Sequence, residues 1–531
     1  MKSPSIKILV VLISAIPSFI FAQLNLTLKA HIPYNEASSS CWGYSAHGKE
    51  YAIIGVESGT LIYDITNPTN PIKKGFIGGN NSQWREMKVI GEYCYVTSEA
   101  GPAIQIISLA TLPDTVNWSK NMDFTVPGVS STYRKGHTIT NDENGFLYLN
   151  GGGNSTRGAS VILDTKPDPT NPTVIGKING PYCHDSYAIG DRLYASCGGA
   201  GVNIYNIAKK DSTYFLANIT LNNGYSHNSW TNNSQTHLFT TEEIPVNLPV
   251  GSYDIQNLNN IFNVDKFWRN ETKNTEVVPH NVHVVGDDFI VTAYYTDGIS
   301  VIDGKHPDNL IEVAHYDTYL VNEGGYHGVW GVYPYFPSGN LIASDIEGGL
   351  WIFTPQYKHA CWLEGKVTDS ITGALLSDVK VSINHPSVGQ RVSNGQGIYK
   401  TGIGISGTYS VTYEKSGYFP LQIDVDLFND SLLTKNVVLR PIQIRANAST
   451  LLDPSLKLLY HKDKTVLEYA LGADSNSGNL EILSVSGVQV GSEILSQNQG
   501  YSNIGSDLLP GIYLVKITNQ KGKSSTIKLL K

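Results

Sequence analysis

Charged residues are scarce in this chain of 531 residues, and no stretch of it is strongly basic. Lys, Arg, Asp and Glu make up 16% of the chain, against roughly 25% in an average soluble protein. The net charge of −8 comes from 38 basic and 46 acidic residues, so binding of nucleic acid through phosphate contacts is not expected. Methionine is also rare, at 3 residues, whereas 51 glycines and 31 tyrosines are typical of a chain rich in turns and strands. A helical bundle and a coiled coil are therefore not expected.

Long apolar segments are lacking except at the N-terminus. Lys2 and Lys7 precede an apolar run over residues 8–22, which contains Pro17 and ends before Gln23. A short basic start, a modest apolar stretch and a small residue before the cut are typical of a secretory signal. No later run approaches the about 20 apolar residues of a spanning helix. We predict a signal peptide at residues 1–22 and an exported, soluble chain without a transmembrane segment.

Only five cysteines occur, and none forms a Cys-x-x-Cys pair, so a metal held by cysteine is not expected. Because five is odd, at least one cysteine is unpaired unless chains are cross-linked. Cys183 and Cys197 can face each other if residues 183–197 form a hairpin around Gly190. That spacing permits a disulfide without establishing it, because the cross-strand geometry must also fit.

An internal repeat extends from about residue 24 to residue 357. It is clearest at residues 59–64, where a strand-like segment begins with Gly, ends with Asp and is followed by Pro. Six related segments begin near residues 103, 159, 201, 252, 298 and 349. Short apolar runs bounded by Gly, Asn and Pro indicate strands, and a period of roughly 40–55 residues is that of propeller blades. We predict a seven-bladed β-propeller over residues 23–357; six or eight blades are the alternative, because the second and fifth copies are degenerate.

The two ends of this repeat complement each other. The seventh copy ends near Phe353 without an obvious fourth strand, whereas residues 24–32 are strand-like and precede the first inner strand. We expect residues 24–32 to complete the last blade, which would leave the ring without an open edge.

A second regularity concerns the start of the first strand in each copy. His184 and His280 lie six residues before the turn glycines Gly190 and Gly286. Five of the seven corresponding positions are histidine, although the chain has only 14. First strands line the channel of a propeller, so we predict a ring of candidate ligand-binding residues. Its members are Trp42, Arg85, His137, His184, His227, His280 and His327.

Three kinds of chemistry are open to this ring. Converging imidazoles can bind a divalent transition metal, and the candidate metal ligands are His137, His184, His227, His280 and His327. They can also act as general acids and bases, or donate to an anionic ligand when protonated. A purely structural role is the alternative, in which each histidine bonds a strand to the neighbouring blade. Nearby carboxylates that can join the ring are Glu57, Glu86, Glu99, Asp185, Glu242, Glu243 and Asp345.

No catalytic residue is assigned from the sequence. The chain contains no Gly-x-Ser-x-Gly elbow, phosphate-binding loop or His-Glu-x-x-His motif. The clustered aromatic residues are more often blade packing than a platform for sugars.

The Gly-led strand that ends in Asp before Pro resembles the LVIVD repeat. Residues 24–357 as a whole are similar to the choice-of-anchor B proteins of bacteria, which are exported propellers with different C-terminal anchors. The resemblance implies no established enzymatic activity. The fifth copy departs most from the pattern, because residues 242–274 contain a long irregular insertion.

Two small β domains are predicted after the repeat. Alternating strands at residues 361–440, separated by glycine turns, predict a β-sandwich and resemble the carboxypeptidase regulatory-like domain, a transthyretin-type fold. The resemblance implies a spacer or binding module without catalysis. Residues 441–455 have the composition of a linker.

The last domain is predicted at residues 456–531. Its strand at residues 509–517 and its basic, apolar end resemble the C-terminal sorting domain of type IX secretion cargo, found in Bacteroidota. That family often opens with Pro-Asn-Pro, whereas Leu452, Asp453 and Pro454 stand here. The resemblance implies passage across the outer membrane, with the secretion machinery as partner, and a location at the cell surface or outside the cell.

The sequence thus predicts an exported surface protein that acts as a binding or scaffold module. The alternative is a metal-dependent oxidoreductase or hydrolase with its site at the histidine ring. A third possibility, an adhesin for surface glycans, requires an exposed aromatic platform.

Overall fold

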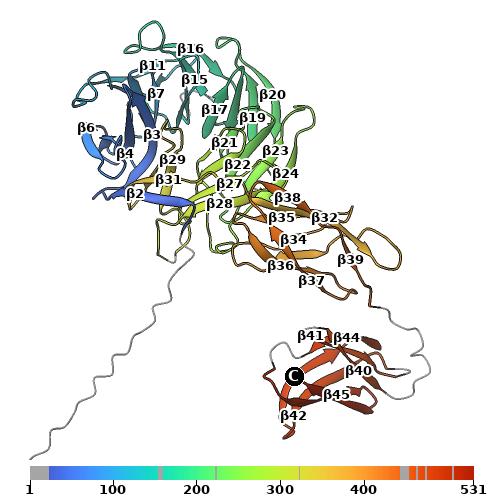
Figure 1. Ribbon diagram of the computed structural model, residues 1–531. Helices are drawn as coiled ribbons and strands as arrows, with labels where there is room; N and C mark the ends of the chain where they lie inside the picture. Colours follow the sequence, from blue (N-terminus) through green and yellow to red (C-terminus); the bar gives the residue numbers. More distant parts are fainter. Residues whose placement is uncertain are drawn as a thin grey trace, which may run out of the picture. The chain divides into compact units, whose positions relative to one another are not determined.

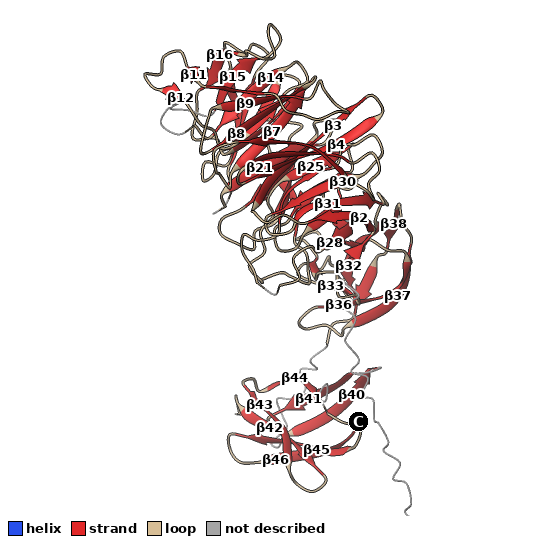
Figure 2. Ribbon diagram, turned by 90° about the vertical axis from the view of Figure 1, so that its left-hand side faces the viewer, coloured by secondary structure: helices blue, strands red, loops and turns tan. Residues whose placement is uncertain are grey.

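The computed structural model describes residues 23–152, 160–221, 224–321, 323–442, 454–461, 464–472, 475–504 and 508–531. These residues form strands, turns and loops, with no helix among them (Figure 2). The predicted all-β class is therefore confirmed. None of the described segments is a helix capable of crossing a membrane. The predicted signal peptide lies outside the described residues, as does most of the predicted linker.

Residues 23–357 fold as a β-propeller. The described part holds seven antiparallel sheets of four strands, one of them extended by a short fifth strand, and we number them blades 1 to 7 along the chain. The first strands contact one another in series, and the first strand of blade 7 contacts that of blade 1, so the sheets close into a ring (Figure 1).

The strands of blades 1 to 4 are given first strand first. Blade 1 has β3 (Ser38–Ala46), β4 (Lys49–Val56), β5 (Gly59–Asp64) and β6 (Ile72–Gly78). Blade 2 has β7 (Arg85–Ile90), β8 (Tyr93–Ser98), β9 (Ile104–Ser108) and β10 (Ser119–Met122). Blade 3 has β13 (Ile139–Asn141), β14 (Phe146–Asn150), β15 (Ser160–Asp164) and β16 (Thr173–Ile178). Blade 4 has β17 (Asp185–Ile189), β18 (Arg192–Ser196), β19 (Val202–Asn206) and β20 (Tyr214–Ile219).

Blades 5 to 7 follow the same plan. Blade 5 has β21 (Ser226–Thr231), β22 (His237–Glu242), β23 (Val250–Asp254) and β24 (Phe262–Phe267). Blade 6 has β25 (Val282–Val285), β26 (Phe289–Ala293), β27 (Ile299–Asp303) and β28 (Ile311–Tyr316). Blade 7 has β29 (Val329–Tyr333), β30 (Leu341–Asp345) and β31 (Gly349–Pro355). A separate hairpin pairs β11 (Phe124–Thr125) with β12 (Thr132–Tyr133).

The N-terminal segment completes the ring. Strand β2 (Leu26–Ile32) pairs antiparallel with β31, from Leu26 opposite Pro355 to Ile32 opposite Leu350. The two strands come from opposite ends of the propeller sequence and lie side by side in Figure 1. The predicted closure is confirmed for this strand. The preceding β1 (Gln23–Leu24) pairs instead with β28 of blade 6.

The repeat pattern has a direct physical origin. Strands β4 and β5 are buried on both faces, because neighbouring blades cover both sides of a sheet, so their apolar residues run continuously. Glycine precedes the third strand because the backbone passes close to the fourth. At Gly201 and Gly298, φ is positive, and a Cβ atom would lie 2.1 Å from a carbonyl oxygen of the adjacent strand.

Blade 5 is more regular than the sequence indicates. The segment expected to be a long irregular insertion contains β23 and β24, which pair along their whole length apart from one bulge. The irregular chain lies on either side of these two strands, in the connection from β22 to β23 and in the one from β24 to β25.

All five cysteines are buried free thiols. The predicted hairpin around Gly190 forms, as β17 pairs with β18. The Cys183 thiol donates to the carbonyl oxygen of Asp185 at 3.0 Å, and the Cys197 thiol donates to that of Ala195 at 3.3 Å.

Residues 361–416 and 420–439 form two sheets that pack with the propeller as one compact unit. The first sheet has β32 (Cys361–Asp369), β35 (Ile398–Ile403), β38 (Ser431–Thr434) and β39 (Val437–Leu439). The second has β33 (Lys380–Ile383), β34 (Arg391–Val392), β36 (Gly407–Glu414) and β37 (Leu421–Leu427). We call these residues the second module. Trp362 joins it to the propeller: its side chain is 1% exposed within the apolar core of blades 6 and 7, and Nε1 donates to the carbonyl oxygen of Asn309 at 3.2 Å.

Residues 417–419 and 440–531 form a second compact unit. One of its sheets has β40 (Ser455–His461), β41 (Lys464–Ala470) and β44 (Gln499–Ile504). The other has β42 (Gly478–Ser484), β43 (Gln489–Leu495), β45 (Ile512–Asn519) and β46 (Ser524–Leu530). Leu467, Leu480, Val515 and Leu529 lie in its apolar core.

Candidate functional site

Four histidines of consecutive blades lie side by side at the start of the first strands. The ring centroids of His137 and His184 are 4.2 Å apart, those of His184 and His227 are 4.4 Å apart, and those of His227 and His280 are 3.9 Å apart. Blades 3, 4, 5 and 6 each contribute one ring. We call these four residues the histidine row.

Hydrogen bonds fix the orientation of the row. Nδ1 of His184 lies 3.2 Å from the carbonyl oxygen of His227, and Nδ1 of His280 lies 2.5 Å from that of Trp330. A carbonyl oxygen only accepts, so each Nδ1 is the donor and Nε2 of the neutral ring carries a lone pair. These bonds connect neighbouring blades, as expected if the histidines have a structural role. They also leave Nε2 as the atom that can bind a ligand.

Burial keeps the middle of the row uncharged. It lowers the pKa of His184 well below the usual value, and the neighbouring histidines add to that shift. It likewise lowers the pKa of His227 to about 3 and that of His280 well below the usual range. Neutral imidazoles bind transition metals, whereas they offer no positive charge to an anionic ligand.

The end of the row at His137 has a carboxylate partner. Nδ1 of His137 lies 2.6 Å from Oε1 of Glu99, and this hydrogen bond lowers the pKa of Glu99. At the opposite end, the Trp330 ring of blade 7 lies edge-on to His280, with centroids 5.0 Å apart.

His327 lies apart from the histidine row. Its Nδ1 is 2.6 Å from Oε1 of Glu347, and its ring stacks on Tyr319. The adjacent position in blade 7 is taken by Trp330, which lies at a bulge of β29 just as His227 lies at a bulge of β21.

The two other predicted members of the ring also point elsewhere. The Arg85 side chain donates to the carbonyl oxygens of Val56 at 3.1 Å and Asn80 at 2.7 Å, so it clamps blade 2 to the end of blade 1. Trp42 packs beneath the ammonium group of Lys88, which lies 4.2 Å from its ring centroid, and beside His283.

A layer of buried polar groups lies next to the row. Lys88 Nζ is 2.5 Å from Oε1 of Glu86, and Asn228 Nδ2 donates to Oδ2 of Asp185 at 2.6 Å. Burial raises the pKa of Asp185 to about 7; the negative charge of Glu86 adds to this shift, and Lys88 opposes it. Glu86 and Asp185 were both expected from the sequence as carboxylates near the ring.

Another of those carboxylates, Glu243, lies beside the row. His184, His227 and Glu243 each present one ligand atom, and the three atoms lie within 4.8 Å of one another. The Tyr295 hydroxyl donates to Oε1 of Glu243 at 3.3 Å. This trio is the one cluster of histidine, cysteine and carboxylate groups with metal-binding spacing among the described residues.

The channel itself is nearly filled. The cavity beside the histidine row has a volume of about 20 Å³, and the one beside Trp42, Lys88 and His283 has a volume of about 10 Å³. Such spaces hold a water molecule or an ion.

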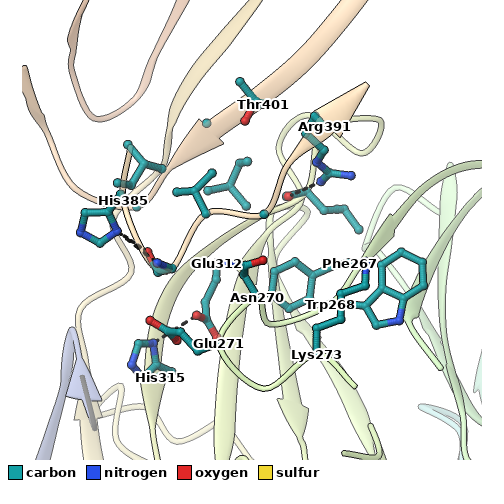
Figure 3. Close-up of a pocket in the computed structure, with 18 of the residues that line it drawn as sticks. Phe267, Trp268, Asn270, Glu271, Lys273, Glu312, His315, His385, Arg391 and Thr401 are labelled. Atoms are coloured by element: carbon teal, nitrogen blue, oxygen red, sulfur yellow. Dashed lines mark hydrogen bonds and ion pairs between the residues drawn. The ribbon is translucent and has the colours of Figure 1, made fainter. Parts of the chain in front are cut away.

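A much larger cavity of about 620 Å³ lies between the propeller and the second module. Its propeller wall includes Trp268, Lys273 and Glu312, and its opposite wall is formed by residues 387–391 and 401–405 of the second module. Figure 3 shows Glu271, Glu312 and His315 grouped on one side, with Trp268 and Lys273 away from them. Sequence reasoning missed this cavity, because it forms where the outer strands β24 and β28 and the connection after β24 meet the second module, which the repeat pattern does not describe.

Buried ion pairs support the walls of this cavity. Arg269, 4% exposed at its side chain, contacts Glu312 at 3.1 Å, Glu271 at 3.1 Å and Asp297 at 3.6 Å. Burial raises the pKa of Asp297 to about 6. Across the boundary between the modules, Arg391 contacts Asp265 at 3.0 Å.

Comparisons with known proteins identify no family for this chain. No family model matches the chain, and no curated protein matches it by sequence. Among solved structures, it is similar to the computationally designed Ika8 protein, with 8% identity over 70% of this chain and 99% of that chain and a TM-score of 0.41. It is also similar to the WD40 β-propeller domain of Doa1, with 10% identity over 63% of this chain and 97% of that chain and a TM-score of 0.42.

Proposed function

We propose that this chain is an exported β-propeller that acts as a binding and scaffold module at the cell surface. The observation that carries the proposal is the difference in size between its cavities. The space between the propeller and the second module, about 620 Å³, is in the range of ligand sites, whereas the channel cavities of about 10 and 20 Å³ are not. A second cavity of about 380 Å³ beside blades 4 and 5, lined by Leu248 and Phe262, is also in that range. We assign the ligand to the larger cavity, between the modules.

The cavity walls suit a polar ligand. Lys266, Lys273, Glu271 and His385 supply charged or hydrogen-bonding groups, and Trp268 supplies an aromatic surface. The resemblance to choice-of-anchor B proteins, which have no established enzymatic activity, and to a regulatory-like spacer domain supports the same role.

The proposal is tested by filling the cavity. Val388 lines it, whereas Val438 belongs to the same module, is 56% exposed and lies outside the lining. Oligosaccharide and peptide arrays are probed with residues 23–531 and with the variants Val388→Trp and Val438→Trp. A ligand bound by the unaltered chain and by Val438→Trp, and lost in Val388→Trp, supports the proposal. Binding that survives in Val388→Trp, or no array ligand at all, refutes it.

Delivery to the surface is proposed to use the type IX secretion machinery through residues 456–531. The support is the strand pattern at residues 509–531 and its resemblance to sorting domains. A chain lacking residues 467–531 is expected to accumulate in the periplasm, measured by cell fractionation. Normal export of that truncation would refute the sorting role.

A metal-dependent oxidoreductase or hydrolase is the second candidate. The cluster of His184, His227 and Glu243 favours it, because three protein ligands with an open position are typical of catalytic zinc. The small channel cavities weigh against it, since they leave no room for an organic substrate beside the row. Zinc-dependent turnover of a substrate by the intact chain, lost in Glu243→Gln, would favour the enzyme.

A further inference from the structure

We propose that His184, His227 and Glu243 bind one Zn²⁺ ion at the histidine row. This proposal is independent of the ligand site in the large cavity. The three residues come from two adjacent blades, and their ligand atoms lie within 4.8 Å of one another. Zinc bonds to nitrogen and oxygen are about 2.0–2.2 Å long, so small side-chain rotations bring all three atoms to one ion.

The two histidines are already oriented for binding. Nδ1 of His184 donates to the carbonyl oxygen of His227, which leaves Nε2 as the nitrogen with a free lone pair. The Tyr225 ring lies edge-on to His184, with centroids 5.5 Å apart, and restricts its rotation. His227 is 3% exposed; its Nδ1 atom makes no hydrogen bond of good geometry among the described residues, although the backbone of His280 lies close enough to raise its pKa against the effect of burial. A buried ring with an unsatisfied nitrogen is stabilised when it gains a water molecule or an ion as partner.

A hydrogen bond from Tyr295 orients the carboxylate of Glu243. The Tyr295 side chain is 2% exposed, and its hydroxyl holds Oε1 of Glu243. Groups that bond to a ligating carboxylate orient it and raise metal affinity. Glu243 is itself only partly buried, which gives an ion a route from solvent to the site.

The other two histidines of the row belong to no cluster of three ligand groups among the described residues. Nδ1 of His137 bonds to Glu99, and Nδ1 of His280 bonds to the carbonyl of Trp330. Two imidazoles and one carboxylate suit Zn²⁺ and other first-row transition metals, whereas magnesium prefers oxygen ligands alone. The cavity of about 20 Å³ beside the row borders His184 and His227 and has the size of one water molecule or one ion.

The test compares two carboxylates at the same row. Residues 23–531 are freed of metal by a chelator and titrated with Zn²⁺ by calorimetry, with elemental analysis of the complex. We expect one ion per chain, at least about tenfold weaker binding in Glu243→Gln, and unchanged binding in the matched control Glu99→Gln. Magnesium titrated in the same way is expected not to bind.

A second variant leaves Glu243 in place, so it tests the site even if Glu243→Gln alters the connection after β22. Tyr295→Phe removes one hydroxyl group and is expected to weaken Zn²⁺ binding about tenfold with an unchanged circular dichroism spectrum. Absence of stoichiometric zinc overturns the proposal. So does binding that is lost in Glu99→Gln and kept in Glu243→Gln, because the ion would then belong to His137.

Discussion

The central channel and the cavity beside the second module are built by opposite rules. Equivalent positions of consecutive blades form the channel, so its side chains meet at short range and leave only about 10 and 20 Å³. The larger cavity lies where the outer strands β24 and β28 and a connection that occurs once meet the second module, and nothing in the repeat requires this boundary to be filled. The difference teaches that a ring of repeats produces a dense, preorganised cluster, whereas an irregular boundary produces space for a ligand.

Removing the closing strand should damage both sites and have the largest effect. Deletion of residues 24–32 exposes β31 along its length and removes Leu26, which is 3% exposed in the core of blades 6 and 7. We expect loss of cooperative unfolding of the propeller, measured by calorimetry. An unchanged melting temperature would show that the ring does not depend on β2.

Truncating Trp362, which joins the second module to the propeller, should affect the large cavity and leave the histidine row intact. Trp362→Ala deletes a side chain that is 1% exposed, at an expected cost of about 3–5 kcal/mol in the free energy of unfolding. Calorimetry should then resolve the second module from the propeller, while zinc binding at the histidine row persists. A single transition at the original temperature, or simultaneous loss of zinc binding, would contradict the separation.

The ion pair of Glu312 with Arg269, at the wall of the large cavity, should make the free energy of unfolding depend on pH. Burial by itself would raise the pKa of Glu312, but Arg269 and His315 outweigh it and bring the pKa to about 2. A lowered carboxyl pKa stabilises the fold above the unfolded value of about 4.5, and the contribution disappears as pH falls towards 2. Glu312→Gln should therefore cost about 3 kcal/mol at pH 7, because it leaves Arg269 poorly compensated.

Urea unfolding at pH 7, 5, 4 and 3 measures this effect. The difference between the variant and the unaltered chain should be constant from pH 7 to 5 and decrease below that. Glu271→Gln is the matched control, since Glu271 contacts the same Arg269 with a side chain that is 21% exposed, and its effect should be smaller. A difference that grows towards acid pH would show that Glu312 is not the stabilising carboxylate.

The smallest effect on stability is expected from Val388→Trp. The new ring enters a cavity of about 620 Å³ and so meets little of the overpacking that destabilises a filled core. We expect a change in unfolding free energy within about 1 kcal/mol. A large loss would mean that the cavity is smaller in solution than the structure shows.

Several features of the fold followed from the sequence because they depend on local pattern. Short apolar runs bounded by Gly and Pro predicted the strands, and the missing fourth strand of the last copy predicted the pairing of β2 with β31. Equal spacing from the turn glycines placed His184 and His280 at one level, and His137 and His227 join them. The blade count, the sandwich folds, the sorting domain and the family remain predictions from the sequence.

Residue spacing failed to predict the members of the ring where the register of a first strand differs from that of the others. His327 was aligned with the others by its place before the strand, but Trp330 lies at a bulge of β29 and faces His280 instead. Arg85 occupies an equivalent backbone position, yet its longer side chain reaches the carbonyl groups of blade 1. The direction of a side chain depends on its neighbours, and a count of residues contains no information on them.

The sequence by itself determined the all-β class, the strand that closes the ring and the presence of histidine at equivalent positions, because backbone propensity and repeat spacing act along the chain. Only the tertiary structure decided which histidines meet, that Glu243 joins two of them, and that a large cavity lies beside the second module. These outcomes depend on groups distant in the sequence, and on burial, which sets the pKa of each imidazole and the space left between modules.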